Sequence, residues 1–179
     1  MKAVIHSEAE RALILERIKG HNPEKAKALL QLSWATGLRC AEIAGLLVTD
    51  IVYSDNPKLV VRASISKTGE AREIPLSETA LQAIIILAET RLSGHLVLGR
   101  QDKPYTPHSL SERFKKLYQS AGIKGSTYSG RRGLATRLVD QGAPLPVVQR
   151  ILGHKNLTST MHYIGVTDSM VSKWMQKAA

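Results

Sequence analysis

The spacing of apolar positions predicts three helices in the first part of the chain, at residues 7–20, 23–37 and 40–47. Ser7 can cap the first of them, because Glu10 follows three residues later as in a capping box. The second opens with a proline in its first turn, where the missing N–H costs nothing, and it ends at a glycine. The first part of the chain is therefore expected to be helical.

The pattern changes its period after residue 50. KLVVRASIS and REIPL are typical of strands, and the intervening SKTGEA has the glycine and polar residues of a hairpin turn. Residues 50–75 are thus expected to form a small antiparallel sheet of two or three strands. Helical spacing returns afterwards, at residues 77–91, 107–121, 128–141, 144–152, 157–163 and 167–177. The predicted fold is mainly α with a small antiparallel β-sheet (α+β), in a single domain over residues 1–179.

Composition is that of a globular protein in a reducing compartment. The 179 residues suffice to bury a core, and 43% of them are hydrophobic. The single cysteine, Cys40, can form no internal disulfide and no cysteine-based metal site, which favours the cytoplasm. Charges interrupt the apolar residues of the N-terminus, and the longest apolar run, residues 83–88, is too short to span a membrane. The sequence therefore predicts a cytoplasmic protein.

Positive charge is concentrated in the second half of the sequence. The formal net charge is +10. Residues 1–99 carry 12 lysines and arginines against 11 acidic residues, whereas residues 100–179 carry 13 against 4. A one-sided positive field favours a polyanionic partner, most simply nucleic acid. The alternative is a basic protein without a nucleic-acid ligand, because charge alone does not identify a partner.

Two candidate functional groups lie in the first half of the chain. In TGLRCAEI, Gly37 permits a sharp turn, and Arg39 is expected in the first turn of the next helix, three residues before Glu42. An arginine held by a carboxylate presents a fixed fork to a phosphate, and the alternative is a surface ion pair. Lys67 is expected at the tip of the predicted hairpin, where it can donate a proton in a groove or simply be solvated.

A third candidate is the stretch TYSGRRGLATRL. Thr127 or Ser129 can cap the helix that follows, with Arg131 and Arg132 in its first turn. Cations there oppose the helix macrodipole, and such a conflict is more often functional than structural. With the N–H groups of the helix start, the two arginines would make a phosphate site. Arg137, further along, is either a contact to a nucleic-acid backbone or merely exposed.

The last candidate is LGHKNLTSTMHY, which contains His154 and Tyr163. A tyrosine hydroxyl, with a pKa of about 10, is a poor nucleophile at neutral pH. It needs a proton acceptor and an electrophile whose charge is neutralised, which a phosphodiester flanked by Arg39, Arg131 and His154 would supply. Taken alone, Tyr163 is better explained as a half-buried helix residue whose hydroxyl acts as a tether.

These four motifs, in this order, resemble those of the catalytic domain of the tyrosine recombinases, the phage integrase family. The resemblance covers nearly the whole chain from about residue 7, in the stretches TGLRCAEI, ISKTGEAREIPL, YSGRRGLAT and LGHKNLTSTMHY. The site residues that it implies are the two arginines Arg39 and Arg131, the lysine Lys67, the histidine His154, the nucleophile Tyr163 and the supporting acid Glu42.

Two features depart from the family pattern. Tyr128 stands three residues before Arg131, where the family usually has a histidine. A tyrosine there can donate a hydrogen bond to a phosphate but accepts a proton poorly near neutral pH, and its hydroxyl is a second, lower-ranked candidate nucleophile. The chain also has no room for the N-terminal helical domain that family members usually carry. We therefore expect a catalytic domain alone, either excised or naturally minimal.

The resemblance implies a recombinase that cleaves and rejoins DNA strands by transesterification, without metal, cofactor or ATP. Tyr163 would form a 3′-phosphotyrosyl link, and Lys67 would protonate the leaving 5′-oxygen as general acid. Arg39 and Arg131 would neutralise the charge of the transition state, helped by a hydrogen bond from His154. Further DNA contacts are expected from other basic residues of these motifs, Arg132, Arg137 and Lys155.

The implied partners are double-stranded DNA and further copies of the chain, up to a tetramer on DNA, and the implied origin is prokaryotic or phage. The C-terminal helix places Met170, Val171, Trp174 and Met175 on one side, which can pack on its own domain or dock on a neighbouring subunit. Three alternatives stay open: a non-enzymatic DNA-binding protein of the same fold, a type IB topoisomerase-like enzyme that relaxes DNA, and a basic helical protein unrelated to DNA cleavage.

Overall fold

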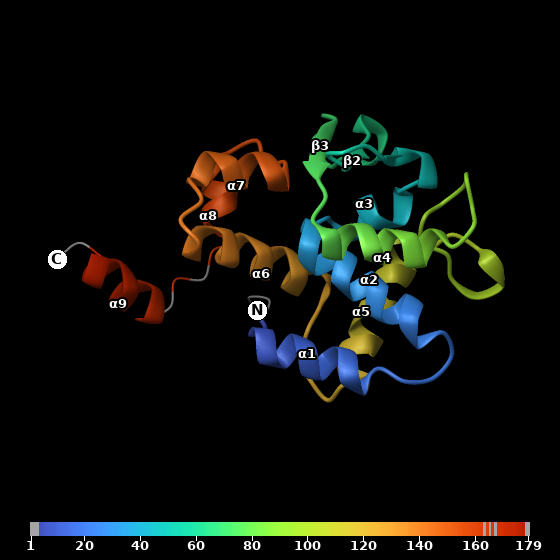
Figure 1. Ribbon diagram of the computed structural model, residues 1–179, viewed down its shortest axis with the longest axis horizontal. Coiled ribbons are helices and arrows are strands. Elements are labelled where there is room, and N and C mark those ends of the chain that lie inside the picture. The colour runs from blue at the N-terminus through green and yellow to red at the C-terminus, as the bar shows by residue number, and fades with distance from the viewer. Residues whose placement is uncertain (1–3, 163, 165, 167, 178–179) are drawn as a thin grey trace.

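The computed structural model describes residues 4–162, 164, 166 and 168–177, and it is mainly helical with one small sheet (Figure 1). Its α-helices are α1 (Glu8–Arg17), α2 (Pro23–Thr36), α3 (Cys40–Gly45), α4 (Glu78–Ala88), α5 (Pro107–Ser120), α6 (Thr127–Asp140), α7 (Leu145–Leu152), α8 (Leu157–Met161) and α9 (Asp168–Lys177). The 3-10 turns are η1 (Val48–Asp50), η2 (Ala63–Ile65) and η3 (Arg100–Asp102). None of the described helices is long and apolar enough to cross a membrane.

The sheet is antiparallel and has three strands, β1 (Ile51–Val52), β2 (Lys58–Val61) and β3 (Arg72–Pro75), in the order β1-β2-β3. Leu59 and Ile74 pair across β2 and β3, and both side chains are buried. Alternation along β3 sets the face of each residue, so Arg72 lies on the same face as Ile74. The predicted fold class, mainly α with a small antiparallel sheet, is confirmed.

Local signals in the sequence set several helix ends. The Ser7 hydroxyl accepts the Glu10 N–H at 3.1 Å, and the Glu10 carboxylate accepts the Ser7 N–H at 2.8 Å, so the predicted capping box is present. At α4 the Ser77 hydroxyl accepts the Ala80 N–H at 3.3 Å, a single cap without the return bond. Gly37 ends α2 with a φ of 62°, and a Cβ there would lie 2.9 Å from a methyl carbon of Leu134. Glycine is therefore required at this turn on two counts.

Several predicted boundaries differ from the observed ones, and two of the differences have a clear physical cause. α1 ends at Arg17, three residues before the expected glycine, because Ile18 leaves the helix in an extended conformation and enters the core. β2 ends at Val61 instead of continuing to residue 66, because Arg62 turns back to Asp50 and the next three residues form η2. In both cases a contact that is distant in the sequence overrides the local pattern.

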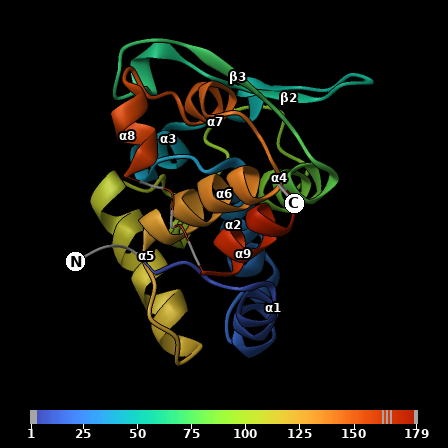
Figure 2. The same ribbon diagram turned by 90° about the vertical axis from the view of Figure 1, so that its left-hand side faces the viewer.

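The core is built around α2, which is buried over most of its surface because it packs against both α4 and α6. One cluster of buried apolar residues joins α1, α2, α3, the sheet, α4 and α5. Trp34 of α2 and Tyr118 of α5 are both buried, and the indole N–H donates to the phenol oxygen at 2.9 Å. This bond joins α2 to α5, and both helices contact α6 (Figure 2).

α7 buries less apolar surface against its neighbours than the central helices do. It contacts α6, α8 and β3, and a separate small cluster of Ala135, Val148 and Leu152 links it to α6. Figure 1 shows α7 and α8 together beside α6, on the side away from α1. The position of α7 therefore depends strongly on polar contacts, and these gather at its C-terminal end.

Candidate active site

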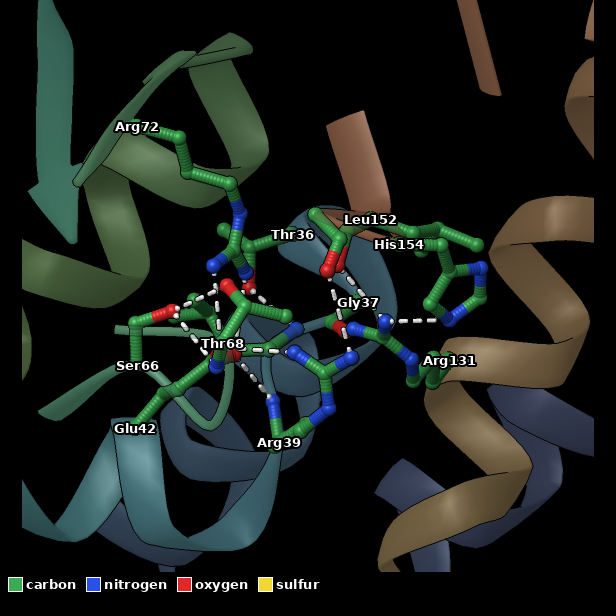
Figure 3. Close-up of polar contacts among 12 residues, drawn as sticks. Thr36, Gly37, Arg39, Glu42, Ser66, Thr68, Arg72, Arg131, Leu152 and His154 are labelled. Carbon is green, nitrogen blue, oxygen red and sulfur yellow. Dashed lines mark hydrogen bonds and ion pairs between the residues drawn. The ribbon is translucent and has the colours of Figure 1, made fainter. Parts of the chain in front are cut away.

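Three arginines from separate elements converge on the C-terminal turn of α7 (Figure 3). Each guanidinium donates to a different one of three successive carbonyls: Arg72 to Ile151 at 3.2 Å, Arg131 to Leu152 at 2.6 Å and Arg39 to Gly153 at 3.3 Å. The last carbonyls of a helix have no partner within it, and they form the negative end of its dipole. This turn can thus anchor three cations that come from distant parts of the chain.

Glu42 joins two of these arginines. Its side chain is 0% exposed, and its two oxygens accept hydrogen bonds from Arg39 and Arg72. The bonds run from Arg39 N–H (2.7 Å), Arg39 Nη1 (3.0 Å), Arg72 Nη1 (2.9 Å) and Arg72 Nη2 (2.9 Å). Burial raises the pKa of Glu42, but the bonds and charges of Arg72 and Arg39 outweigh it, so the pKa lies below its usual range.

The predicted pair of Arg39 and Glu42 is present, and its setting differs from the prediction. Arg39 is the N-cap residue of α3, with extended backbone, and does not lie in the first turn of the helix. The pair is not on the surface, since the Arg39 side chain is 16% exposed and Glu42 is fully buried. Breaking a buried pair leaves an uncompensated charge, which costs far more than the loss of a surface pair.

Arg131 lies deeper in the protein than predicted. α6 begins at Thr127, and the Ser129 hydroxyl accepts the N–H of the N-cap residue Ser126 at 3.1 Å. Arg131 and Arg132 are therefore in the second turn, so their expected place in the first turn is wrong, while phosphate binding by them stays a prediction. Arg131 is 1% exposed, and its Nη1 donates to the carbonyl of Gly37 at 2.8 Å. The turn after α2 and the end of α7 are thus held by one guanidinium.

His154 is buried between Arg131 and Thr160. The imidazole Nε2 lies 2.7 Å from Arg131 Nη2, and because an arginine can only donate, Nε2 accepts. The proton therefore sits on Nδ1, which donates to the Thr160 hydroxyl at 2.9 Å. Arg131 therefore fixes the tautomer, and the fully buried Thr160 hydroxyl holds the plane of the ring. In this arrangement Nε2 is an acceptor, and the hydrogen bond from His154 to a phosphate that the family resemblance implies stays a prediction.

Acid is expected to destabilise the protein through His154. Burial lowers the pKa of His154, and the charges of Arg131, Arg39 and Arg72 outweigh that of Glu42, so that together they bring it from 6.5 to about 4. Between these two values the unfolded chain binds a proton that the folded chain does not. The free energy of unfolding should therefore fall as the pH falls from about 6.5 to about 4.

Urea denaturation at a series of pH values measures this effect. In the His154→Gln variant the loss of stability across the same window should be smaller than in the wild type, because the titrating group is gone. The other histidines are common to both proteins and cancel in the difference. Equal pH slopes for the two proteins would contradict the inferred neutral, buried imidazole.

The side chains of the other predicted site residues are exposed to solvent to different degrees. Lys67 is exposed in the turn of residues 66–69, which the Gly69 N–H closes on the Ser66 carbonyl at 3.2 Å. Tyr128 is 55% exposed in the first turn of α6, on the same side as Arg131. A pocket of about 510 Å³ lies between the hairpin turn and α7, bordered by Thr68, Glu70, Arg72, Gln149 and His154. Tyr163 lies outside the described residues.

The three residues predicted to bind DNA differ in how the protein holds them. Lys155 is exposed and lies 3.8 Å from Glu70. Arg132 is half-buried. Arg137 is not merely exposed, because its Nη2 donates to the Trp34 carbonyl at 2.7 Å, and burial lowers its pKa to about 10. DNA binding by Arg137 stays a prediction, while its bond to α2 gives it a structural role.

Sequence reasoning missed two members of this network, Arg72 and Thr160. Arg72 could have been found from the two-residue period of its strand, because it stands two residues before the buried Ile74 and so lies on the same, inward face. Thr160 carried no such signal, because a threonine in a short polar helix is ordinary. Only the folded chain reveals that its hydroxyl faces His154.

The sequence matches the phage integrase family over residues 4–170. It is 30% identical over 158 residues to the tyrosine recombinase XerA of Pyrococcus horikoshii, which covers 85% of this chain and 54% of that protein. It is 34% identical over 158 residues to the tyrosine recombinase XerD of Corynebacterium glutamicum, which covers 83% and 51%. The chain spans about half the length of the curated relatives it matches.

Solved structures share the fold. The crystal structure of XerA recombinase superposes with a TM-score of 0.84 at 22% identity, over 99% of this chain and 66% of that one. The Tn1549 transposon integrase in complex with transposon right end DNA gives 0.81 at 22% identity, over 100% and 67%. At these identities the likeness demonstrates the common arrangement of helices around a small sheet.

Proposed function

Since the chain belongs to the phage integrase family, we propose that it is a site-specific DNA recombinase acting through a 3′-phosphotyrosyl intermediate. Tyr163 loses its hydroxyl proton to solvent and attacks the phosphorus, the bond to the 5′-oxygen breaks, and Lys67 gives that oxygen a proton. The phosphotyrosyl link retains the free energy of the original phosphodiester. Rejoining to a second strand therefore needs no ATP.

The observation that carries this proposal is the convergence of Arg39, Arg131 and His154 on one turn of α7. Two guanidinium groups beside one histidine concentrate positive charge in a space with little water. Such charge stabilises a pentacoordinate phosphate far more than it would in solution. The net charge of +10 further supports a polyanionic substrate.

The remaining roles follow from this arrangement. Glu42 holds Arg39, and Tyr128 takes the place usually filled by histidine and donates to a phosphate oxygen. Arg131 is 1% exposed, so its contact with a phosphate requires neighbouring groups to rearrange. Lys155 and Arg132 bind the DNA backbone, which gives affinity without sequence preference.

A covalent capture experiment tests the proposal. The protein is incubated with a pool of nicked duplexes of randomised sequence, and adducts that survive detergent and denaturant are recovered and sequenced. A recurring sequence in the adducts, and joining of the captured strand to a second duplex, are the expected results. Adducts that relax plasmid DNA without joining duplexes would indicate the topoisomerase-like alternative. Binding without any adduct would indicate a non-enzymatic DNA-binding protein and overturn the proposal.

We further propose that copies of the chain assemble on DNA through α9. Figure 1 shows this helix at the edge of the molecule, where Lys173 donates to the Asp140 carbonyl at 2.8 Å. Met170 is 7% exposed and packs on its own chain, whereas Trp174 is 44% and Met175 67% exposed. This supports a face of α9 that remains available to a neighbour.

Deletion of residues 167–179 is expected to leave binding of a single copy to DNA in place and to impair assembly of several copies. The reason is that the exposed apolar side chains of α9 are lost, whereas the arginines at the end of α7 are kept. Native gels of the protein on a recovered target duplex separate complexes by copy number. An unchanged ladder of complexes would contradict a docking role for α9.

A further inference from the structure

Arg72 holds two parts of the candidate active site at once. Its Nη1 and Nη2 donate to the two oxygens of Glu42 at 2.9 Å each, which is the bidentate geometry of a planar fork on a carboxylate. Its Nε donates to the Ile151 carbonyl at 3.2 Å, in the turn that leads to His154. The side chain is 10% exposed. Each nitrogen of this guanidinium therefore already has a partner within the protein.

The partners of Arg72 explain what depends on it. Glu42 uses its remaining capacity to accept both the backbone N–H and Nη1 of Arg39. The carboxylate can aim Arg39 only if its own rotation is fixed, and two parallel bonds from one guanidinium fix it. The backbone of Gly153 also lies against Arg72, since a Cβ there would be 2.9 Å from Nε. No larger residue fits between them.

We propose that Arg72 is a positioning residue for strand cleavage, one that fixes the Glu42 carboxylate, and through it Arg39, while it holds the end of α7 that carries His154. This inference rests on the proposed recombinase function. Arg72 acts through its neighbours and touches no reacting atom. Its contribution comes from the planar fork with three donating nitrogens, which a lysine of equal charge cannot reproduce.

Arg62 provides a matched control on the same hairpin. Its Nε donates to the buried Asp50 carboxylate at 2.7 Å, and its Nη2 donates to the Gly45 carbonyl at 2.6 Å. Like Arg72, it therefore pairs with a buried acid and donates to a backbone carbonyl. Unlike Arg72, it forms no bond with Arg39, Arg131 or His154, or with a residue that binds them. Replacing either arginine by lysine removes the same kind of bonds and keeps the charge.

The test compares Arg72→Lys with Arg62→Lys in two measurements. The first is the single-turnover rate of adduct formation at saturating DNA, together with the dissociation constant for that DNA. We expect Arg72→Lys to form the adduct about tenfold to 100-fold more slowly, because a small displacement of catalytic groups slows a reaction by this order. Its dissociation constant for DNA should stay within about twofold of the wild-type value. Arg62→Lys should cleave at the wild-type rate. Wild-type cleavage by Arg72→Lys would overturn the proposal.

The second measurement does not depend on activity. The Nε–H signal of Arg39 in nuclear magnetic resonance spectra, assigned with Arg39→Lys, reports how that guanidinium is held. We expect it to move in Arg72→Lys and to stay in Arg62→Lys. If wild type forms no adduct, the recombinase proposal fails, and this signal alone decides the positioning role: a shift supports it, and an unmoved signal overturns it.

Assays are run at a temperature at which circular dichroism shows each variant folded. Should Arg72→Lys not fold, Arg72→Gln replaces it, because a glutamine amide can bond Glu42 or the Ile151 carbonyl but cannot hold both. The same fall in rate at unchanged affinity is then expected. A glutamine variant that cleaves like wild type would contradict the proposal as directly as the lysine variant.

Discussion

Replacement of Tyr163 by phenylalanine is expected to abolish the covalent DNA adduct while DNA binding persists. Without the hydroxyl no phosphotyrosyl bond can form, whatever the state of the surrounding arginines. Binding persists because affinity comes mainly from cations that neutralise phosphates. Denaturing gels of protein on labelled nicked DNA measure the adduct, and native gels measure the binding.

Tyr128→Phe is the matched control, since it also removes one tyrosine hydroxyl. Tyr128 is exposed in the first turn of α6, and its phenol is expected only to donate a hydrogen bond to the phosphate. Loss of one such bond should slow adduct formation by about tenfold and leave the adduct detectable. The reverse result, an adduct in Tyr163→Phe and none in Tyr128→Phe, would assign the nucleophile to Tyr128.

Arg131→Lys is expected to reduce both cleavage and stability strongly. The wild-type guanidinium contacts the carbonyls of Gly37 and Leu152 and the Nε2 of His154, all in a buried setting. A single ammonium group cannot reach all of these positions. We expect adduct formation to slow by about 100-fold, as for loss of a transition-state donor. Unpaired buried acceptors should lower the free energy of unfolding by about 2 kcal/mol.

Arg91→Lys separates the two effects of the Arg131 variant. Arg91 also donates to backbone carbonyls, those of Leu87 at 2.5 Å and Leu96 at 2.9 Å, but at the end of α4, away from the site. Urea denaturation should show a similar loss of stability, whereas single-turnover cleavage should match wild type. Equal cleavage by Arg131→Lys and Arg91→Lys would remove Arg131 from the proposed chemistry.

Much of the fold could be predicted because its signals are local. The capping box at Ser7 and Glu10, the cap at Ser77 and the glycine that ends α2 each act within a few residues. The alternation of β3 and the apolar spacing of the helices are equally short-range. The errors arose where a distant partner intervened, as when Arg62 turned toward Asp50 and ended β2 early.

Most members of the candidate site were predictable from the sequence, whereas Arg72, Thr160 and the arrangement of the site were not. The motifs named Arg39, Glu42, Arg131 and His154, and the fold brings these four together. They did not indicate that Glu42 is fully buried or that Arg131 lies in the second turn of α6. The expected place of Arg131 in the first turn was wrong because that helix begins one residue earlier, at Thr127.

The sequence by itself determined the order of helices and strands, the excess of positive charge and the identity of most reactive side chains. The order of helices and strands depends on residues within one turn or one strand, and the charge and the side chains are given by the sequence directly. Tertiary structure alone decided that the last carbonyls of α7 would receive Arg72, Arg131 and Arg39, and that Arg131 would set the tautomer of His154. The physical reason is that unpaired carbonyls at a helix end accept any donor the fold supplies, and spacing along the chain does not specify which donor arrives.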